Sequence, residues 1–174
     1  MRRLLLIAVA ALSCHGFHPA YGKPPVPGPF LDAQEVTWKV NEFNVARWKT
    51  LVGGIEGGQI DASDVQFGVW ELAPRATYHG HKHAAPEIYF ILDGRALWSV
   101  GEESREVAEG STIYTKPGEV HKMVNLTDEP VRAVWFWWAP GGDADVFRAP
   151  YEFTEPAPAQ PAGARFEDPS ERRY

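Results

Sequence analysis

The chain has only one cysteine among its 174 residues, Cys14, so no disulfide can form within it. It has no basic stripe, zinc-finger spacing or arginine-rich arm, and its formal net charge is −6. We therefore expect no nucleic-acid partner. No apolar run is long enough to span a bilayer stably, and no stretch shows a helical pattern of convincing length. These absences favour a single domain built mainly from strands.

Hydrophobic residues make up 44% of the chain, which is enough for one domain with a real core. Aromatic residues are abundant, with 7 Trp, 9 Phe and 6 Tyr. We expect most of these rings to fill the core of a sheet structure, because aromatic side chains bury large apolar areas.

Residues 1–22 have the pattern of a secretory signal peptide. Arg2 and Arg3 form a positive start, residues 4–12 form a short apolar run, and residues 20–22 offer a cleavage site. This predicts a periplasmic or secreted protein. A lipoprotein anchored at Cys14 is the weaker alternative, because Ala11 stands where a large aliphatic residue is expected.

The remainder divides into three predicted parts. Residues 23–35 form a proline-rich linker, residues 36–148 form the folded domain, and residues 149–174, rich in Pro, Ala and charge, form a disordered tail. Strands are expected at 64–72, 78–83, 87–92, 95–100, 107–115, 123–126 and 131–138. Asp93-Gly94 predicts a tight hairpin. An N-terminal strand within 36–48 should pair with the domain or with a partner subunit. Many short strands separated by turn residues indicate an all-β barrel or sandwich.

Potential metal ligands concentrate in residues 78–94. His81, His83, Glu87 and Tyr89 share one parity, so in an extended strand they would line one face of a sheet. Imidazole and carboxylate together suit a borderline divalent cation. His121, about thirty residues on, would add a ligand from another strand and leave open positions for water or substrate.

The spacing of these residues resembles the two motifs of the cupin superfamily. The first motif here is His81-x-His83, three residues, Glu87, six residues and Gly94; the second is Gly110, then Pro117-Gly118, two residues, His121, three residues and Asn125. Two positions depart from the family pattern: Arg75 replaces a glycine, and Lys116 stands where the proline usually lies. The resemblance covers about residues 64–140. It implies a single cupin β-barrel that binds one metal through His81, His83, Glu87 and His121.

Within the superfamily, the chain resembles the cupin-type dimethylsulfoniopropionate lyases, which have a Tyr before the histidine pair and a Glu-x-Tyr after it. Tyr78 and Tyr89 stand at these places. The resemblance implies β-elimination on a small carboxylate, with Tyr89 as the base and Tyr78 orienting the substrate. A sulfonium group would lie against aromatic rings through cation–π attraction, with Trp98, Trp135 and Trp137 as candidates. Asn125 is a further candidate for the pocket, or a loop support.

Several alternatives stay open on the sequence. The same ligands suit an iron-dependent dioxygenase, a sugar-acid isomerase or ring-opening enzyme, and a metal-binding cupin without catalysis. The metal is one divalent transition ion, with Fe, Mn, Zn and Ni all compatible. The partner is a small-molecule substrate. Cupin barrels often pair through sheet edges, so a homodimer is expected by analogy.

Overall fold

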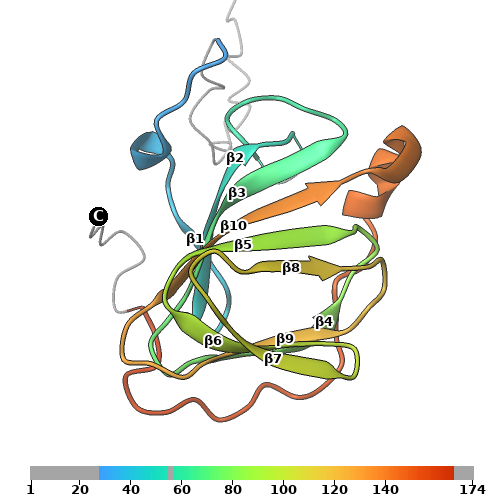
Figure 1. Cartoon of the computed structure of the whole chain (residues 1–174). Coiled ribbons are helices and arrows are strands. Elements are labelled where there is room, and N and C mark those ends of the chain that lie inside the picture. The colour runs from blue at the N-terminus through green and yellow to red at the C-terminus, as the bar shows by residue number, and fades with distance from the viewer. Residues whose placement is uncertain (1–27, 55–56, 167–174) are drawn as a thin grey trace, which may run out of the picture.

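The computed structural model describes residues 28–54 and 57–166. Two antiparallel sheets face each other and enclose the core (Figure 1). This confirms the predicted all-β fold. The predicted signal peptide, Cys14 and the first part of the linker lie outside the described residues. Within the described part of the chain, none of the helices is long and apolar enough to cross a membrane.

The first sheet has six strands in the order β1-β2-β3-β10-β5-β8, and the second has five in the order β11-β4-β9-β6-β7. The first consists of β1 (Lys39–Val40), β2 (Ala46–Val52), β3 (Val65–Leu72), β10 (Val131–Trp138), β5 (Glu87–Asp93) and β8 (Thr112–Thr115). The second consists of β11 (Glu152–Phe153), β4 (Thr77–Lys82), β9 (His121–Asn125), β6 (Arg95–Val100) and β7 (Glu103–Ala108). Three short 3-10 helices complete the fold: η1 (Ala33–Glu35), η2 (Pro140–Gly142) and η3 (Ala144–Phe147).

The core lies between the two sheets. Leu72, Ile91 and Met123 are fully buried there, and Val131 and Ala133 lie beside them on β10. Each large aliphatic side chain buried in this way contributes about 1.5–3 kcal/mol relative to an exposed one. Inward residues of β3, β5 and β10 alternate with outward ones, so one face of the first sheet builds the core.

The turn at Asp93-Gly94 does not form the hairpin that the sequence predicts. β5 belongs to the first sheet and β6 to the second, so the turn carries the chain from one sheet to the other. Gly94 has φ +86°, and a Cβ there would lie 2.8 Å from the Pro130 carbonyl oxygen and 2.9 Å from Val131 Cα. Glycine is therefore needed here because the turn passes close to the backbone of residues 130 and 131. An Asp-Gly dipeptide alone does not show whether the chain forms a hairpin or crosses to the other sheet.

Residues 149–166, which we call the C-terminal strap, lie against the barrel, where the sequence predicted disorder. β11 pairs with β4, with Glu152 opposite Lys82 and Phe153 opposite His81. Gln160 exchanges side-chain hydrogen bonds with both backbone groups of Thr77. Phe166 is buried in the core. The composition suggested disorder because apolar residues are sparse, but these few anchors suffice to place the strap. An N-terminal strand is also present, but it lies later than expected. Only β1 falls wholly within 36–48, whereas β2, which pairs with β3 of its own barrel, extends to Val52.

Candidate metal centre

The predicted metal ligands come from both sheets. His81 lies on β4, His83 in the loop that follows it, His121 at the start of β9, and Glu87 at the start of β5 in the opposite sheet. The prediction that the first three ligands share one face of a sheet is therefore wrong in its geometry. β4 ends at Lys82, and the loop of residues 83–86 carries the chain to the opposite sheet, where Glu87 faces the histidines.

The three histidines converge on one point. His81 and His121 are directly paired between β4 and β9, and their ring centroids are 4.0 Å apart. One ring nitrogen from each of His81, His83 and His121 lies within 4.8 Å of the others, and all three side chains are buried. Such a cluster of imidazoles in the interior is the arrangement that a divalent metal needs.

Hydrogen bonds to the backbone set the orientation of all three rings. Nδ1 of His81 lies 2.9 Å from the His79 carbonyl oxygen, Nδ1 of His83 lies 2.8 Å from that of Ala85, and Nδ1 of His121 lies 3.1 Å from that of Glu119. A carbonyl oxygen can only accept, so each Nδ1 carries a hydrogen. In the neutral ring, Nε2 then has the free lone pair and is the ligand atom, as in metal-binding histidines generally.

Glu87 is the fourth predicted ligand, and it contacts two of the three histidines. Its Oε2 lies 3.1 Å from Nε2 of both His83 and His121, but only the contact with His83 has hydrogen-bond geometry. Nε2 of His121 is therefore a buried polar atom without a hydrogen bond. Lone pairs and a carboxylate that face one another are stabilised by a shared cation, so these residues fit a metal ion.

Electrostatics favour the metal-binding forms of His81 and Glu87. Burial, followed by the neighbouring His121, holds the pKa of His81 well below its ordinary value, so this ring is neutral. Burial of Glu87 alone would raise the pKa of its carboxyl, but the interactions with His121 and His83 outweigh it and lower that pKa strongly. Glu87 is therefore a carboxylate at neutral pH.

A cavity of about 450 Å³ opens beside these residues. Eight of its fourteen lining residues are aromatic: Trp48, Trp70, Tyr78, Tyr89, Trp135, Trp137, Tyr151 and Phe153. Glu42 is at its wall, and no Lys or Arg is among the lining residues that the structure describes. An anionic group inside would therefore find no Lys or Arg side chain among these lining residues.

The two predicted tyrosines line this cavity. Burial raises the pKa of Tyr89 well above its ordinary value, and the negative charge of Glu87 adds to this effect. Burial also raises the pKa of Tyr78 to about 12, although a hydrogen bond from Tyr151 works in the opposite direction. Without a nearby cation, both side chains are neutral phenols at physiological pH.

Tyr151 also lines the cavity, although it is not among the site residues predicted from the sequence, because it lies in the segment predicted to be disordered. Its ring stacks on His81, with centroids 4.8 Å apart and planes 17° apart, and its hydroxyl donates to that of Tyr78 at 2.8 Å. The alternation of Tyr151 and Phe153 about Glu152 was the one signal in the sequence that these rings share a face.

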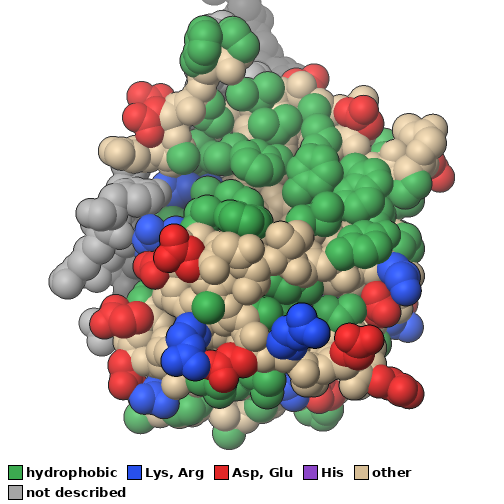
Figure 2. Space-filling model, in the orientation of Figure 1, with side chains coloured by type: hydrophobic (Ala, Val, Ile, Leu, Met, Phe, Trp, Pro, Cys, Tyr) green, Lys and Arg blue, Asp and Glu red, His purple; other side chains and the backbone are tan. Residues whose placement is uncertain are grey.

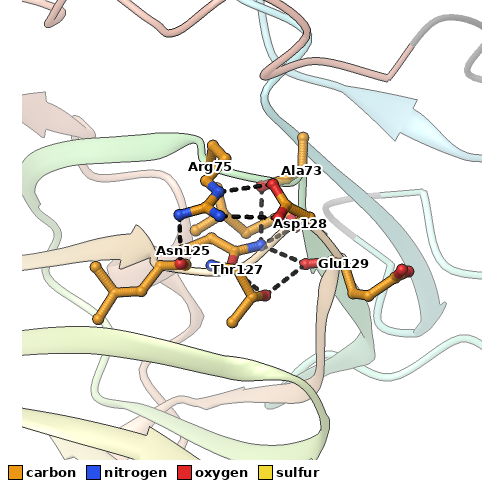
Figure 3. A network of polar contacts seen from close by, with 8 residues as sticks. Ala73, Arg75, Asn125, Thr127, Asp128 and Glu129 are labelled. Atoms are coloured by element: carbon orange, nitrogen blue, oxygen red, sulfur yellow. Dashed lines mark hydrogen bonds and ion pairs between the residues drawn. The ribbon is translucent and has the colours of Figure 1, made fainter.

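Of the four weaker pocket candidates, the structure brings two to the cavity. Trp135 and Trp137 line it. Trp98 packs beneath it instead, with its ring 4.8 Å from that of Tyr89. Asn125 lies away from it and ties loops together (Figure 3). Its side-chain nitrogen donates to the carbonyls of Ala73 and Glu129, and its oxygen accepts from the Thr127 amide, so its role is loop support.

Comparison with known proteins agrees with this geometry. Residues 68–137 match the cupin domain family. An uncharacterised protein of Streptomyces coelicolor is 33% identical over 66 residues, which cover 38% of this chain and 63% of that protein. Dimethylsulfoniopropionate lyase DddW of Ruegeria pomeroyi is 28% identical over 130 residues, which cover 73% of this chain and 83% of the lyase.

A solved structure gives a similar result. The crystal structure of the DMSP lyase DddQ from Ruegeria pomeroyi superposes with a TM-score of 0.56 at 25% identity, covering 72% of this chain and 59% of that one. The chain thus spans a little under two thirds of the length of the Streptomyces protein and of DddQ. Residues 68–137 thus match the cupin domain, and over most of its length the chain is similar to cupin-type dimethylsulfoniopropionate lyases.

Proposed function

We propose that the protein is an exported, metal-dependent cupin lyase that catalyses β-elimination on a small carboxylate carrying an onium group, such as dimethylsulfoniopropionate. The composition of the cavity carries this proposal. Its aromatic walls and Glu42 suit a cationic end by cation–π and charge attraction. The absence of Lys and Arg among its described lining residues leaves the metal to bind the carboxylate. The similarity to DddW supports the same reaction class.

A divalent ion held by His81, His83, Glu87 and His121 would supply a Lewis acid that makes the C–H bond beside the substrate carboxylate more acidic. Its charge would also favour the phenolate of a nearby tyrosine. Side chains of the protein carry out the proton transfer and orient the substrate. Tyr89 accepts the proton from the carbon next to the carboxylate, and Tyr78, held by Tyr151, orients the substrate.

The reaction balances without an oxidant. The electron pair of the broken C–H bond forms the C=C bond of acrylate, and the C–S bond breaks with its pair going to sulfur. Dimethyl sulfide leaves as a neutral molecule, and the proton on Tyr89 returns to solvent. No oxygen is consumed, which separates this reaction from that of a dioxygenase.

The test is a cleavage assay on protein of known metal content, with dissolved oxygen monitored in the same cell. The proposal expects acrylate and dimethyl sulfide in equal amounts with no oxygen uptake. Oxygen consumption without acrylate would replace the lyase by a dioxygenase. Turnover of unsaturated uronates instead would indicate sugar-acid chemistry, and metal binding without any turnover would indicate a non-catalytic cupin.

A further inference from the structure

The middle of the C-terminal strap forms part of the wall of the cavity beside the metal centre. We call residues 151–155 the flap. The strap follows η3 and passes beside β4 of the second sheet (Figure 1). Tyr151 and Phe153 line the cavity, whereas Glu152 between them pairs with Lys82. Alternate residues of the flap therefore face the cavity, as expected of an extended segment.

The rings of the flap are separate from the apolar surface elsewhere on the molecule. Figure 2 shows hydrophobic side chains gathered over the first sheet, where the exposed Phe90 and Tyr114 point outward. Tyr151 is 38% exposed and Phe153 is 43% exposed, although both line the cavity. The flap therefore borders both the cavity and the solvent.

The strap is anchored on both sides of the flap. Phe147, just before the strap, is buried beside Ala85. Beyond the flap, Gln160 forms two hydrogen bonds with Thr77, and Phe166 is buried in the main core. Because burial of large apolar side chains is strongly favourable, both anchors belong to the stable part of the fold.

The flap itself is held by weaker contacts. Its strand, β11, has only two residues, and its ion pairs, Lys82–Glu152 and Lys122–Glu155, are made by partly exposed side chains. Exposed ion pairs contribute little to stability, because water and salt screen them. A weakly held segment between two stable anchors opens locally without unfolding of the domain.

Gly80 of β4 allows the flap to lie close to this strand. Its carbonyl oxygen accepts a hydrogen bond from the Thr154 amide at 2.8 Å, and its amide donates to Glu155 Oε1 at 3.0 Å. A Cβ on Gly80 would lie 2.8 Å from Thr154 Oγ1. The backbone of Gly80 is outside the left-handed region, so glycine is needed here for the close approach and not for its conformation.

Closure of the flap places Tyr151 against the metal centre. Its ring is nearly parallel to those of His81 and His83, with centroid distances of 4.8 and 5.8 Å. Its hydroxyl donates a hydrogen bond to that of Tyr78 at 2.8 Å. Movement of the flap away from β4 would uncover two predicted metal ligands and leave Tyr78 without this hydrogen bond.

We propose that the flap is a lid, which opens to let ligands reach the metal centre and closes to bring Tyr151 over it. In the closed state Tyr151 is a positioning residue, because it acts through the hydroxyl of Tyr78. Closure also excludes water from the site, as the mobile lids of enzymes do. The role through Tyr78 rests on the proposed function, whereas the lid itself requires only a metal at the predicted ligands.

The test measures how fast Zn²⁺ enters the metal-free full chain and how fast it leaves the loaded chain for an excess of chelator. If the open state is populated at ~10% or less, exchange is slowed by that fraction. Tyr151→Ala and Gly80→Val should therefore speed both entry and release at least ~10-fold, with a smaller change in equilibrium affinity. Tyr114→Ala is the matched control, since it removes an exposed tyrosine outside the cavity, and it should exchange metal like the wild type.

Kinetics of cleavage test the role of Tyr151 separately. Tyr151→Phe keeps the ring and removes the hydroxyl, so it should raise KM for dimethylsulfoniopropionate more than it lowers kcat. In a Tyr78→Phe background the same change should have no further effect, because both substitutions remove one shared hydrogen bond. An equal effect in the two backgrounds would show that Tyr151 does not act through Tyr78.

Two results would overturn the lid. The first is metal exchange at the wild-type rate in both Tyr151→Ala and Gly80→Val. The second is faster release with unchanged entry, which would mean that the flap supports the ligands and does not control access. If circular dichroism shows that Tyr151→Ala is unfolded, Gly80→Val decides. If the variants exchange metal as predicted but the wild type releases no acrylate, the proposed function fails together with the role through Tyr78, while the lid stands.

Discussion

Four of the described histidines lie on or near β4 and β9, and their surroundings separate three that converge on one point from a fourth that does not. His81, His83 and His121 each use Nδ1 to bind a carbonyl and direct Nε2 inward. His79 is also buried, but its ring stacks on Phe153 with centroids 4.1 Å apart, and its Nδ1 has no hydrogen bond. His79 and His81 are also two residues apart, so alternation along a strand does not distinguish them in the sequence. The pairing of β4 with β9 shifts register between Tyr78 and His81, and the two rings have different neighbours.

Replacing His83 by Ala should remove most of the bound metal, because the remaining donors no longer surround it. We expect metal retention to fall at least ~10-fold, by analogy with the cost of disturbing metal-site partners. Elemental analysis of the purified variant measures this. His79→Ala is the matched control, since it removes a buried imidazole from the same segment and should keep one metal per chain. Equal metal content in the two variants would contradict the ligand assignment.

Tyr89→Phe should retain the metal and lose catalysis, because it removes only the phenolic oxygen, which accepts the proton as a phenolate. A positioned base contributes about 10²–10⁴-fold, so kcat for acrylate release should fall by that factor. Tyr78→Phe should raise KM more than it lowers kcat, as expected of a residue that orients the substrate. If Tyr78→Phe gives the larger loss of kcat, Tyr78 is the base and Tyr89 the orienting residue.

At the scale of elements, the strands were largely predictable and their partners were not. Alternation located β3, β5, β6 and β10 nearly to the residue. The Asp93-Gly94 turn, however, signals only a change of direction. Whether the next strand pairs with the previous one or crosses to the other sheet depends on long-range packing of Gly94 on Val131, which no local pattern contains.

Gly94→Ala should be clearly more destabilising than Gly110→Ala. Both glycines have left-handed backbones, with φ +86° and +83°, so both variants suffer a conformational cost of about 1–2 kcal/mol. Only at Gly94 does the added methyl also meet backbone atoms, which should add about 1–3 kcal/mol. Urea unfolding measures the difference, and equal losses in free energy of unfolding would show that the crossing is not tightly packed.

The C-terminal strap is held by charge as well as by strand pairing. Glu155 pairs with Lys122 at 2.7 Å and accepts a hydrogen bond from the Gly80 amide at 3.0 Å. Glu152 pairs with Lys82 at 3.1 Å. These anchors hold Tyr151 over His81, so a segment without a clear sequence signal completes the cavity.

The strap should loosen in acid. The hydrogen bond with Lys122, followed by that with the Gly80 amide, lowers the pKa of Glu155 when the strap is closed. A lowered pKa means that the stabilisation is present above the ordinary carboxyl pKa and is lost as pH falls through the lower value. The Thr154 amide donates to the Gly80 carbonyl at 2.8 Å and so reports closure of the strap. Its hydrogen exchange, corrected for the intrinsic pH dependence, should therefore accelerate relative to core amides at acidic pH.

Glu155→Gln provides the control for that experiment. It keeps the shape of the side chain but cannot titrate, so the exchange of the Thr154 amide should be faster at neutral pH and change less in acid. A wild-type strap whose corrected exchange is independent of pH, or a variant that behaves like the wild type, would show that charge does not hold it.

At the scale of the whole molecule, the metal site joins the two sheets. His81 and His121 belong to the second sheet, and Glu87 belongs to the first. The motifs that resemble those of cupins predicted which of these residues meet, because they contain the residues that face one another across the two sheets. The C-terminal strap lies outside these motifs.

The most direct test of the central claim is a titration of metal-free protein with Mn²⁺, Fe²⁺, Zn²⁺ or Ni²⁺ while acrylate release from dimethylsulfoniopropionate is recorded. The account predicts that with at least one of these ions the rate rises in proportion to bound metal and reaches a plateau at one equivalent per chain. Full activity without metal, or no acrylate when one equivalent of each ion is bound, would contradict it.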